Sequence, residues 1–418
     1  ALYFSASLWV KLFAPGLPSS EIPFGVRAFQ VLLLFVFGTA IEAILRSYYQ
    51  VEGHFGLTAF SPLLSGLVVL ASVFFLSGKL SVYALAWGWA VGSLLPVAVM
   101  VLALFFYLPI ERTSAPVQAV SVVAAEWKEL TYVLIVAVLG QLMVLLDRFF
   151  GSFLPPESLS AFYYASLPVL FPMGILIYPV GYAIFPKLSK GLREGMDAEA
   201  STLFSKALGW VNFVLIPMSV LFILAPEEII RLIFERGAFG AISTDLSGRT
   251  LRIFAFSLLA SGYIFVLSRA YLALGLGKRL AEFCIAAFLF KGVVAYPVIR
   301  MWGLEGLAGA GSTALVGLAL LQFWRLPGRV NPFTRRLGFA SFKLAGLSLL
   351  AFGGSLLVSS FLVPSGLYLR EVFLLFVFGF LYVAGCYILK VPEFSETVNL
   401  FRRLVGRKLP YGTASVCL

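Results

Sequence analysis

The chain contains 418 residues, of which 61% are hydrophobic and only 12% are charged. A water-soluble core cannot bury so large an apolar fraction, so the composition excludes a soluble globular protein and predicts a polytopic membrane protein. The net charge of +11 has no aromatic and basic module beside it, which argues against a nucleic-acid partner; membrane topology and attraction to anionic membrane lipids account for it instead.

The chain opens inside an apolar run, Leu2 to Val10, without a basic region before it or a small-residue cleavage site after it. This pattern is not that of a signal peptide. A helix that begins without flanking residues predicts a fragment whose natural N-terminus lies upstream.

Apolar runs of about 20 residues, each long enough to cross roughly 30 Å of hydrocarbon, then recur along the whole chain. Short polar loops separate them and leave no room for a soluble domain. The predicted fold class is therefore an all-α polytopic membrane protein. Its expected spans are 28–50, 58–77, 82–108, 130–153, 159–186, 204–225, 247–272, 280–299, 304–324, 340–363 and 368–390.

Two amphipathic segments fall outside these spans, at 227–239 and in the basic tail at 397–408. In the tail, Val398, Phe401 and Leu404 share one helical face with Val405, and basic residues lie around them. Both segments are expected to lie in the membrane interface, the tail on anionic lipid phosphates.

Basic residues gather on one side of the membrane when successive loops are assigned to alternate sides. The positive-inside rule places that side, and the C-terminus with it, in the cytoplasm. The basic segments concerned are 187–193, 278–279, 325–343 and 390–408.

A weak internal repeat relates residues 46–60 to residues 269–283, in which Arg, Tyr, Leu and Phe coincide. Both copies end one span and begin the next, and both have the same orientation. This placement is typical of a two-lobed transporter with a parallel repeat.

The residue types that catalysis and metal binding require are sparse. Cys284, Cys386 and Cys417 are far apart, and His54 stands alone, so neither a metal site nor a catalytic triad is indicated. No carboxylate cluster suited to a metal and a pyrophosphate, and no nucleotide-binding glycine pattern, is present. We expect no enzyme activity, no catalytic residue and no cofactor.

Charged residues inside the predicted spans are the candidate functional residues, because an ionisable group at membrane depth costs several kcal/mol and usually marks a transport path or a paired site. Three of them have simple structural explanations: Glu42 and Arg46 are spaced as an i,i+4 pair, and Arg269 lies close enough to a helix end to snorkel. The remaining candidates are Asp147, Arg148 and Lys291.

Asp147 and Lys291 are each flanked by apolar residues on both sides. A buried ion pair between them satisfies both charges. Such a pair either takes part in gating or ion binding, or serves only to hold two helices together.

Several motifs resemble one family of membrane transporters. The motifs DRFFGSFL from Asp147, SLSAFYYA from Ser158 and IFPKLS from Ile184 resemble the seventh and eighth helices of the MurJ/MviN lipid II flippases of the MOP superfamily. Residues 230–239, 267–275 and 302–310 are similar to later family segments, so the resemblance covers essentially the whole chain.

This resemblance implies an alternating-access flippase that moves undecaprenyl-linked lipid II to the outer leaflet of the bacterial inner membrane. It implies two six-helix lobes with two extra helices, of which the first two helices would be absent here. The expected domains are 1–115, the rest of the N-terminal lobe; 116–330, the C-terminal lobe; 331–390, the extra helices; and 391–418, a cytoplasmic tail.

The chain departs from the family pattern at two places. Where the family usually has Ala-Asp-Arg in its eighth helix, this chain has Ala165-Ser166-Leu167, which removes an arginine expected to bind pyrophosphate. Some members couple transport to sodium through an Asp that Asp147 resembles; Lys291 and Ala295 then occupy the positions of two further polar ligands. We hypothesise that the Lys291 ammonium replaces sodium.

Two other functions remain open. The missing arginine favours a flippase for another polyprenyl-linked saccharide, or a multidrug antiporter of the same superfamily. A non-transporting scaffold that holds cell-wall synthesis proteins on its basic face is the alternative of a different class.

Overall fold

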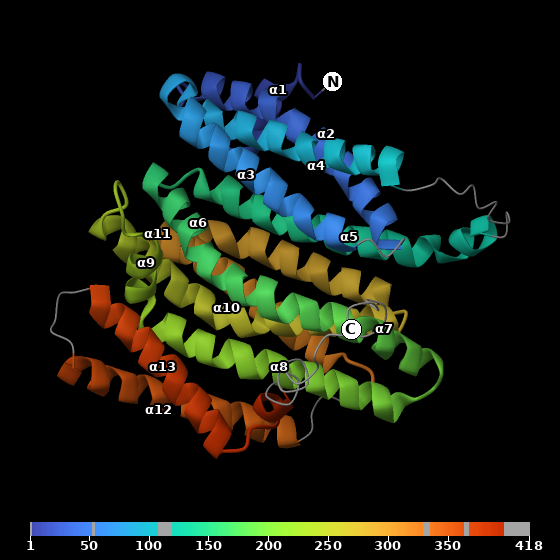
Figure 1. The fold of residues 1–418 in the computed structure, drawn as a ribbon, viewed down its shortest axis with the longest axis vertical. Coiled ribbons are helices and arrows are strands. Elements are labelled where there is room, and N and C mark those ends of the chain that lie inside the picture. Colours follow the sequence, from blue (N-terminus) through green and yellow to red (C-terminus); the bar gives the residue numbers. More distant parts are fainter. Residues whose placement is uncertain (1, 52–54, 108–118, 329–334, 363–367, 397–418) are drawn as a thin grey trace. The chain divides into compact units, whose positions relative to one another are not determined.

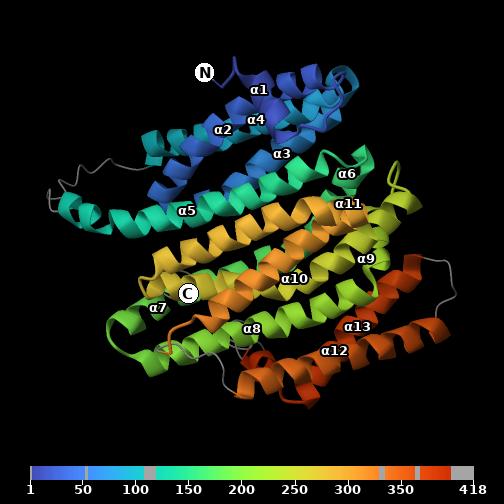
Figure 2. The same ribbon diagram turned by 180° about the vertical axis from the view of Figure 1, so that it is seen from behind.

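A computed structural model describes residues 2–51, 55–107, 119–328, 335–362 and 368–396, and every regular element within these ranges is a helix (Figures 1 and 2). The chain divides into two compact units, Ala1–Ala124 and Ala125–Leu418. Ten described helices are long and apolar enough to cross a membrane. The all-helical membrane class predicted from composition is confirmed.

Unit 1 contains α1 (Ala6–Phe13), α2 (Ile22–Val51), α3 (Phe55–Leu80) and α4 (Tyr83–Tyr107), and α4 packs along both α2 and α3. Two glycines on α4 allow a close approach to α3. A Cβ atom on Gly88 would lie 2.4 Å from Ser72 Oγ, and one on Gly92 would lie 3.0 Å from the Ser65 carbonyl oxygen. Small residues at such a contact let membrane helices pack backbone against backbone.

Unit 2 has its core between α8 (Asp197–Leu224) and α10 (Ala241–Ala273). Phe204, Leu208 and Leu215 of α8, and Leu251 and Leu258 of α10, are fully buried and repeat at helical spacing, which defines one apolar face on each helix. Helix α12 (Arg335–Leu362) packs on α8, and α13 (Tyr368–Ile388) packs on α12. The helices of unit 2 are α5 (Ala119–Gly151, beginning in unit 1), α6 (Pro156–Pro172), the π-helical η1 (Met173–Ile177), α7 (Tyr178–Arg193), α8 (Asp197–Leu224), α9 (Pro226–Phe234), α10 (Ala241–Ala273), α11 (Gly277–Trp324), α12 (Arg335–Leu362) and α13 (Tyr368–Ile388).

The span predicted at 159–186 runs through three consecutive elements, α6, η1 and α7. Pro172 and Pro179 flank the π-helical turn. Proline has no N–H to donate and clashes with the preceding turn, so a wider turn accommodates the chain here. The π-helical turn places Met173 and Tyr178 in the wall of a cavity.

Helix α11 bends at Gly303, whose φ of 55° and ψ of −127° are not helical. A positive φ is readily adopted only by glycine. The bend divides α11 into a first arm, 277–302, and a second arm, 304–324, which correspond to the two spans predicted at 280–299 and 304–324. All eleven predicted spans therefore match a helix, a chain of consecutive helices or an arm.

The amphipathic segment predicted at 227–239 forms α9 over its first part. Its apolar face does not simply rest in the interface, because Ile229 and Ile230 are buried in the core of unit 2. Arg231 donates a hydrogen bond to Glu371 of α13 at 2.6 Å and lies 3.3 Å from Glu235. The hydrogen bond to Glu371 is the main reason that the pKa of Arg231 is raised, so Arg231 stays charged at neutral pH.

The Arg231–Glu371 pair is expected to stabilise unit 2, because Glu371 is nearly buried and loses a charged partner when the pair is broken. Glu371→Gln should lower the free energy of unfolding by about 1 to 2 kcal/mol, a value reduced by the partial exposure of Arg231. The readout is thermal unfolding in detergent. Glu396→Gln, which breaks the exposed 3.0 Å pair with Lys206, is the control and should leave Tm nearly unchanged. Equal Tm values for the two variants would contradict this assignment.

Some predicted features lie outside the described residues: His54, Cys417 and the amphipathic tail at 397–408. The two described cysteines, Cys284 and Cys386, are both free thiols.

Candidate functional site

The second half of α5 packs against both arms of α11. Phe150 of α5 is buried with Ala295 and Ile299 of the first arm and with Leu307 and Ala310 of the second. This apolar cluster fixes the helices around two charged side chains, one from α5 and one from the first arm.

Those two charged side chains are Asp147 and Lys291, and they form an ion pair. Lys291 Nζ lies 2.7 Å from Asp147 Oδ1 and donates a hydrogen bond to the Met143 carbonyl oxygen at 2.9 Å. The Lys291 side chain is only 4% exposed and that of Asp147 is 18% exposed. The contact predicted from the sequence is therefore present, and its functional role remains a prediction.

The second arm of α11 closes the site from the other side. A Cβ atom on Gly311 would lie 3.7 Å from Lys291 Nζ, so a glycine leaves room for the ammonium group. Near the bend the arms touch through their backbones: a Cβ atom on Gly306 would lie 2.3 Å from the Val298 carbonyl oxygen. The bend at Gly303 thus brings the second arm against the ion pair.

Two oxygen atoms around the Lys291 ammonium are of the kinds that also act as ligands of monovalent metal cations. A carboxylate oxygen and a main-chain carbonyl oxygen, those of Asp147 and Met143, converge on one positive charge. That charge is a covalently attached ammonium. Ala295, at the position of the next expected polar ligand, is fully buried in the apolar cluster and offers no oxygen.

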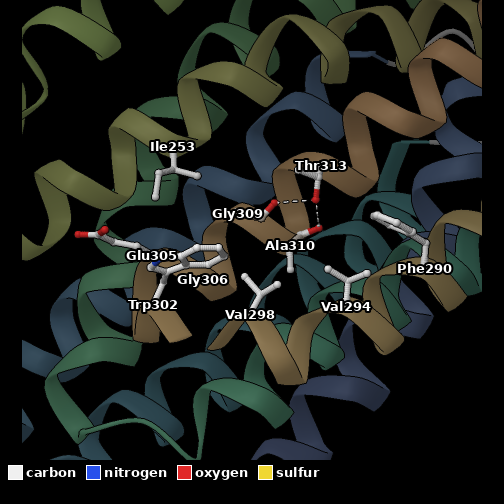
Figure 3. A pocket seen from close by; sticks show the side chains of 10 residues that line it. All are labelled: Ile253, Phe290, Val294, Val298, Trp302, Glu305, Gly306, Gly309, Ala310 and Thr313. Carbon is white, nitrogen blue, oxygen red and sulfur yellow. Dashed lines mark hydrogen bonds between the residues drawn. The ribbon is translucent and has the colours of Figure 1, made fainter. Parts of the chain in front are cut away.

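A cavity of about 470 Å³ lies along the bend of α11 (Figure 3). Apolar side chains of the first arm line it, with Ile253 of α10, and the second arm contributes small residues. Thr313 donates to the Gly309 and Ala310 carbonyl oxygens, so its hydroxyl is occupied. Glu305 supplies a carboxylate at one end (Figure 3). This cavity was not predicted from the sequence, although closely spaced glycines follow Gly303.

The other predicted residues have different surroundings. In unit 1, Glu42 Oε1 accepts hydrogen bonds from both Arg46 and Ser61, so the expected i,i+4 pair exists and Ser61 of α3 joins it. In unit 2, Arg148 is exposed beside Asp147. Arg269 lines a second cavity, and its Cζ atom lies 4.8 Å from the Phe265 ring centroid.

Comparison with known proteins gives a consistent family assignment. The family model described as lipid II flippase MurJ matches residues 1–382. A probable lipid II flippase MurJ of Bdellovibrio bacteriovorus is 27% identical over 387 residues, covering 86% of this chain and 71% of that protein. One of Buchnera aphidicola is 24% identical over 284 residues, covering 65% of this chain and 53% of that protein.

Two solved structures share the fold. A lipid II flippase MurJ in an inward closed conformation superposes with a TM-score of 0.72 at 19% identity, covering 97% of this chain and 80% of that one. An inward-facing multidrug resistance MATE family transporter of the MOP superfamily superposes with a TM-score of 0.60 at 14% identity, covering 82% and 77%. At these identities the superpositions establish the fold alone.

Proposed function

Because the chain belongs to the lipid II flippase MurJ family, we propose that it moves lipid II, a polyprenyl pyrophosphate-linked peptidoglycan precursor, from the inner to the outer leaflet of the bacterial inner membrane. The observation that carries this proposal is the match of the family model over residues 1–382. Transport proceeds by alternating access, without covalent chemistry on the substrate. The basic residues of the cytoplasmic loops support a C-terminus on the cytoplasmic side.

Within this function, the Asp147–Lys291 pair acts as a built-in substitute for a bound cation. A cation that binds and leaves can couple its own gradient to a conformational change, because it shifts the equilibrium only through its different affinities for the two states. The Lys291 ammonium cannot leave. The chain therefore transports without sodium coupling, and the pair makes or breaks contact as the helices α5 and α11 move.

Complementation tests the substrate. The gene that encodes this chain is expressed in a bacterium depleted of its own lipid II flippase, with membrane insertion and abundance verified by immunoblot. Restored growth and cell shape is the expected result. An inserted, abundant protein that does not restore growth would overturn the lipid II assignment and favour another polyprenyl-linked saccharide or a scaffold for cell-wall synthesis proteins.

A multidrug antiporter is the second candidate function. One observation favours it: Ser166-Leu167 stands in place of the family's acidic and basic residues. A drug-sensitive strain that expresses the chain would show raised minimum inhibitory concentrations for cationic drugs. Unchanged drug sensitivity together with complementation would exclude this candidate.

A further inference from the structure

The cavity along the bend of α11 is long and apolar. The first arm lines it with a stripe of bulky side chains that recur at every fourth residue, namely Phe290, Val294, Val298 and Trp302. Phe290 and Trp302 are twelve residues apart, which is about 18 Å along a helix axis. Figure 3 shows their rings toward opposite ends of the cavity. The cavity is therefore shaped for an elongated apolar group.

The second arm lines the same cavity with small residues, namely Gly306, Gly309, Ala310 and Thr313. Gly309 faces open space, because a Cβ atom added to it would meet nothing within 4 Å. The Thr313 hydroxyl already donates to the Gly309 and Ala310 carbonyl oxygens. The interior thus offers a ligand apolar contacts rather than hydrogen bonds, which suits a hydrocarbon chain.

The cavity is open at the protein surface and ends near the membrane interface. Phe290 is 48% exposed and Trp302 is 60% exposed, so a chain can enter from the side. The bend falls between the spans predicted at 280–299 and 304–324. This position places Trp302 and Glu305 near the depth of the interface, where tryptophan is enriched. A lipid whose chain lies in the cavity therefore has its head group beside Glu305.

The charged groups at this end of the cavity carry an excess negative charge. The Glu305 carboxylate points outward (Figure 3), and its nearest described cation, Arg249 Nη1, is 3.9 Å away. Arg249 instead donates to Asp245, from Nε at 3.1 Å and from Nη2 at 2.5 Å. The neighbouring Glu227 and Arg252 neutralise each other at 3.0 Å. One guanidinium with two carboxylates leaves one negative charge without a counter-charge.

This excess charge selects among lipid head groups. A carboxylate attracts an ammonium group and repels a phosphate or a pyrophosphate. Arg249 does not reverse that preference, because Asp245 already accepts hydrogen bonds from two of its nitrogens. A primary ammonium also donates hydrogen bonds to a carboxylate, as Lys does, whereas a head group that ends in hydroxyl groups brings no positive charge. The Glu305 end of the cavity therefore favours an aminolipid.

We propose that this cavity is a binding site for phosphatidylethanolamine, with one acyl chain between the two arms of α11 and the ammonium group on Glu305. The chain contributes affinity that any phospholipid shares, because it removes apolar surface from contact with polar surroundings. The ammonium group contributes the specificity, through a charge-assisted hydrogen bond to the carboxylate. This lipid site does not rest on the transport of lipid II.

Native mass spectrometry of the purified full chain measures binding, with phosphatidylethanolamine and phosphatidylglycerol of identical acyl chains as probes. The unmodified chain is expected to bind phosphatidylethanolamine about tenfold more tightly, the effect of one charge-assisted hydrogen bond. Glu305→Gln should abolish this preference. Glu282→Gln is the matched control: it breaks an exposed 4.0 Å pair on the same arm, with Lys278, and should keep the preference. Equal affinities of the unmodified chain for the two lipids, or an unchanged preference in Glu305→Gln, would overturn the proposal.

A second variant tests whether the acyl chain occupies the cavity. Gly309→Phe fills the open space there and should weaken phosphatidylethanolamine binding about tenfold or more, whereas Gly317→Phe, on the same arm and also facing open space but outside the cavity, should not. If Gly309→Phe does not fold, as judged by its Tm without lipid, Gly309→Leu replaces it. Unchanged affinity in the folded variant would overturn the proposal. Ethidium binding that depends on Glu305, without any lipid preference, would also overturn it and favour a cationic drug.

Discussion

Lys291→Met is expected to lower the free energy of unfolding by about 3 to 5 kcal/mol, because it leaves the carboxylate of Asp147 buried among apolar helices without its cation. The Met143 carbonyl oxygen loses its hydrogen bond at the same time. Thermal or denaturant unfolding in detergent measures the change. Lys278→Met is the matched control, since Lys278 belongs to the same arm of α11 but makes only an exposed pair with Glu282 at 4.0 Å.

The double variant Asp147→Asn, Lys291→Met separates stability from function. No charge remains in the site, so most of the lost stability should return. If the pair takes part in alternating access, transport should stay at least about tenfold below that of the unmodified chain, because the contact that distinguishes two states is gone. Recovery of transport together with stability would reduce the pair to a structural link between α5 and α11.

Lys291→Asn is expected to make the protein sodium-dependent. The substitution removes the fixed charge and adds an amide oxygen beside the Asp147 carboxylate and the Met143 carbonyl oxygen, all of which are hard ligands suited to a small cation. Bound sodium stabilises the folded state by about 2.7 kcal/mol when its concentration is 100 times Kd. The Tm of Lys291→Asn should rise with sodium chloride and not with choline chloride.

The unmodified chain should show no such difference between the two salts, because its site already holds an ammonium group. Transport by Lys291→Asn should likewise increase with sodium. If both Tm and transport of Lys291→Asn are the same in sodium and choline at every concentration, the Lys291 ammonium does not occupy a cation site.

Much of the candidate site was predictable from the chain, because buried charges obey simple rules. Asp147 and Lys291 stood out as two opposite charges within apolar spans, and burial without a partner would be too unfavourable for either. The i,i+4 spacing of Glu42 and Arg46 was equally sufficient for their pair. Ser61, which joins that pair from α3, had no signal in the sequence, because its role depends on how two helices face each other.

The packing of helices against one another determines where the amphipathic segment 227–239 and the side chain of Arg269 lie. The segment at 227–239 was expected in the interface, and part of its apolar face is buried in the core at Ile229 and Ile230. Arg269 was expected to extend toward a helix end, and its guanidinium lies between Phe265 and Phe185. Phe185 and Phe265 belong to different helices, so only the packing of α7 on α10 brings them to the same side chain.

The membrane class, the approximate positions of the spans and the identity of the charged candidates follow from the amino-acid sequence alone. These are local properties: the length of an apolar run and the cost of a charge within it do not depend on the rest of the chain. The bend at Gly303, the approach of Gly311 to Lys291 and the two cavities were decided only by the tertiary structure. They arise where segments distant in sequence meet, and the backbone geometry at such meetings is set by packing rather than by any single residue.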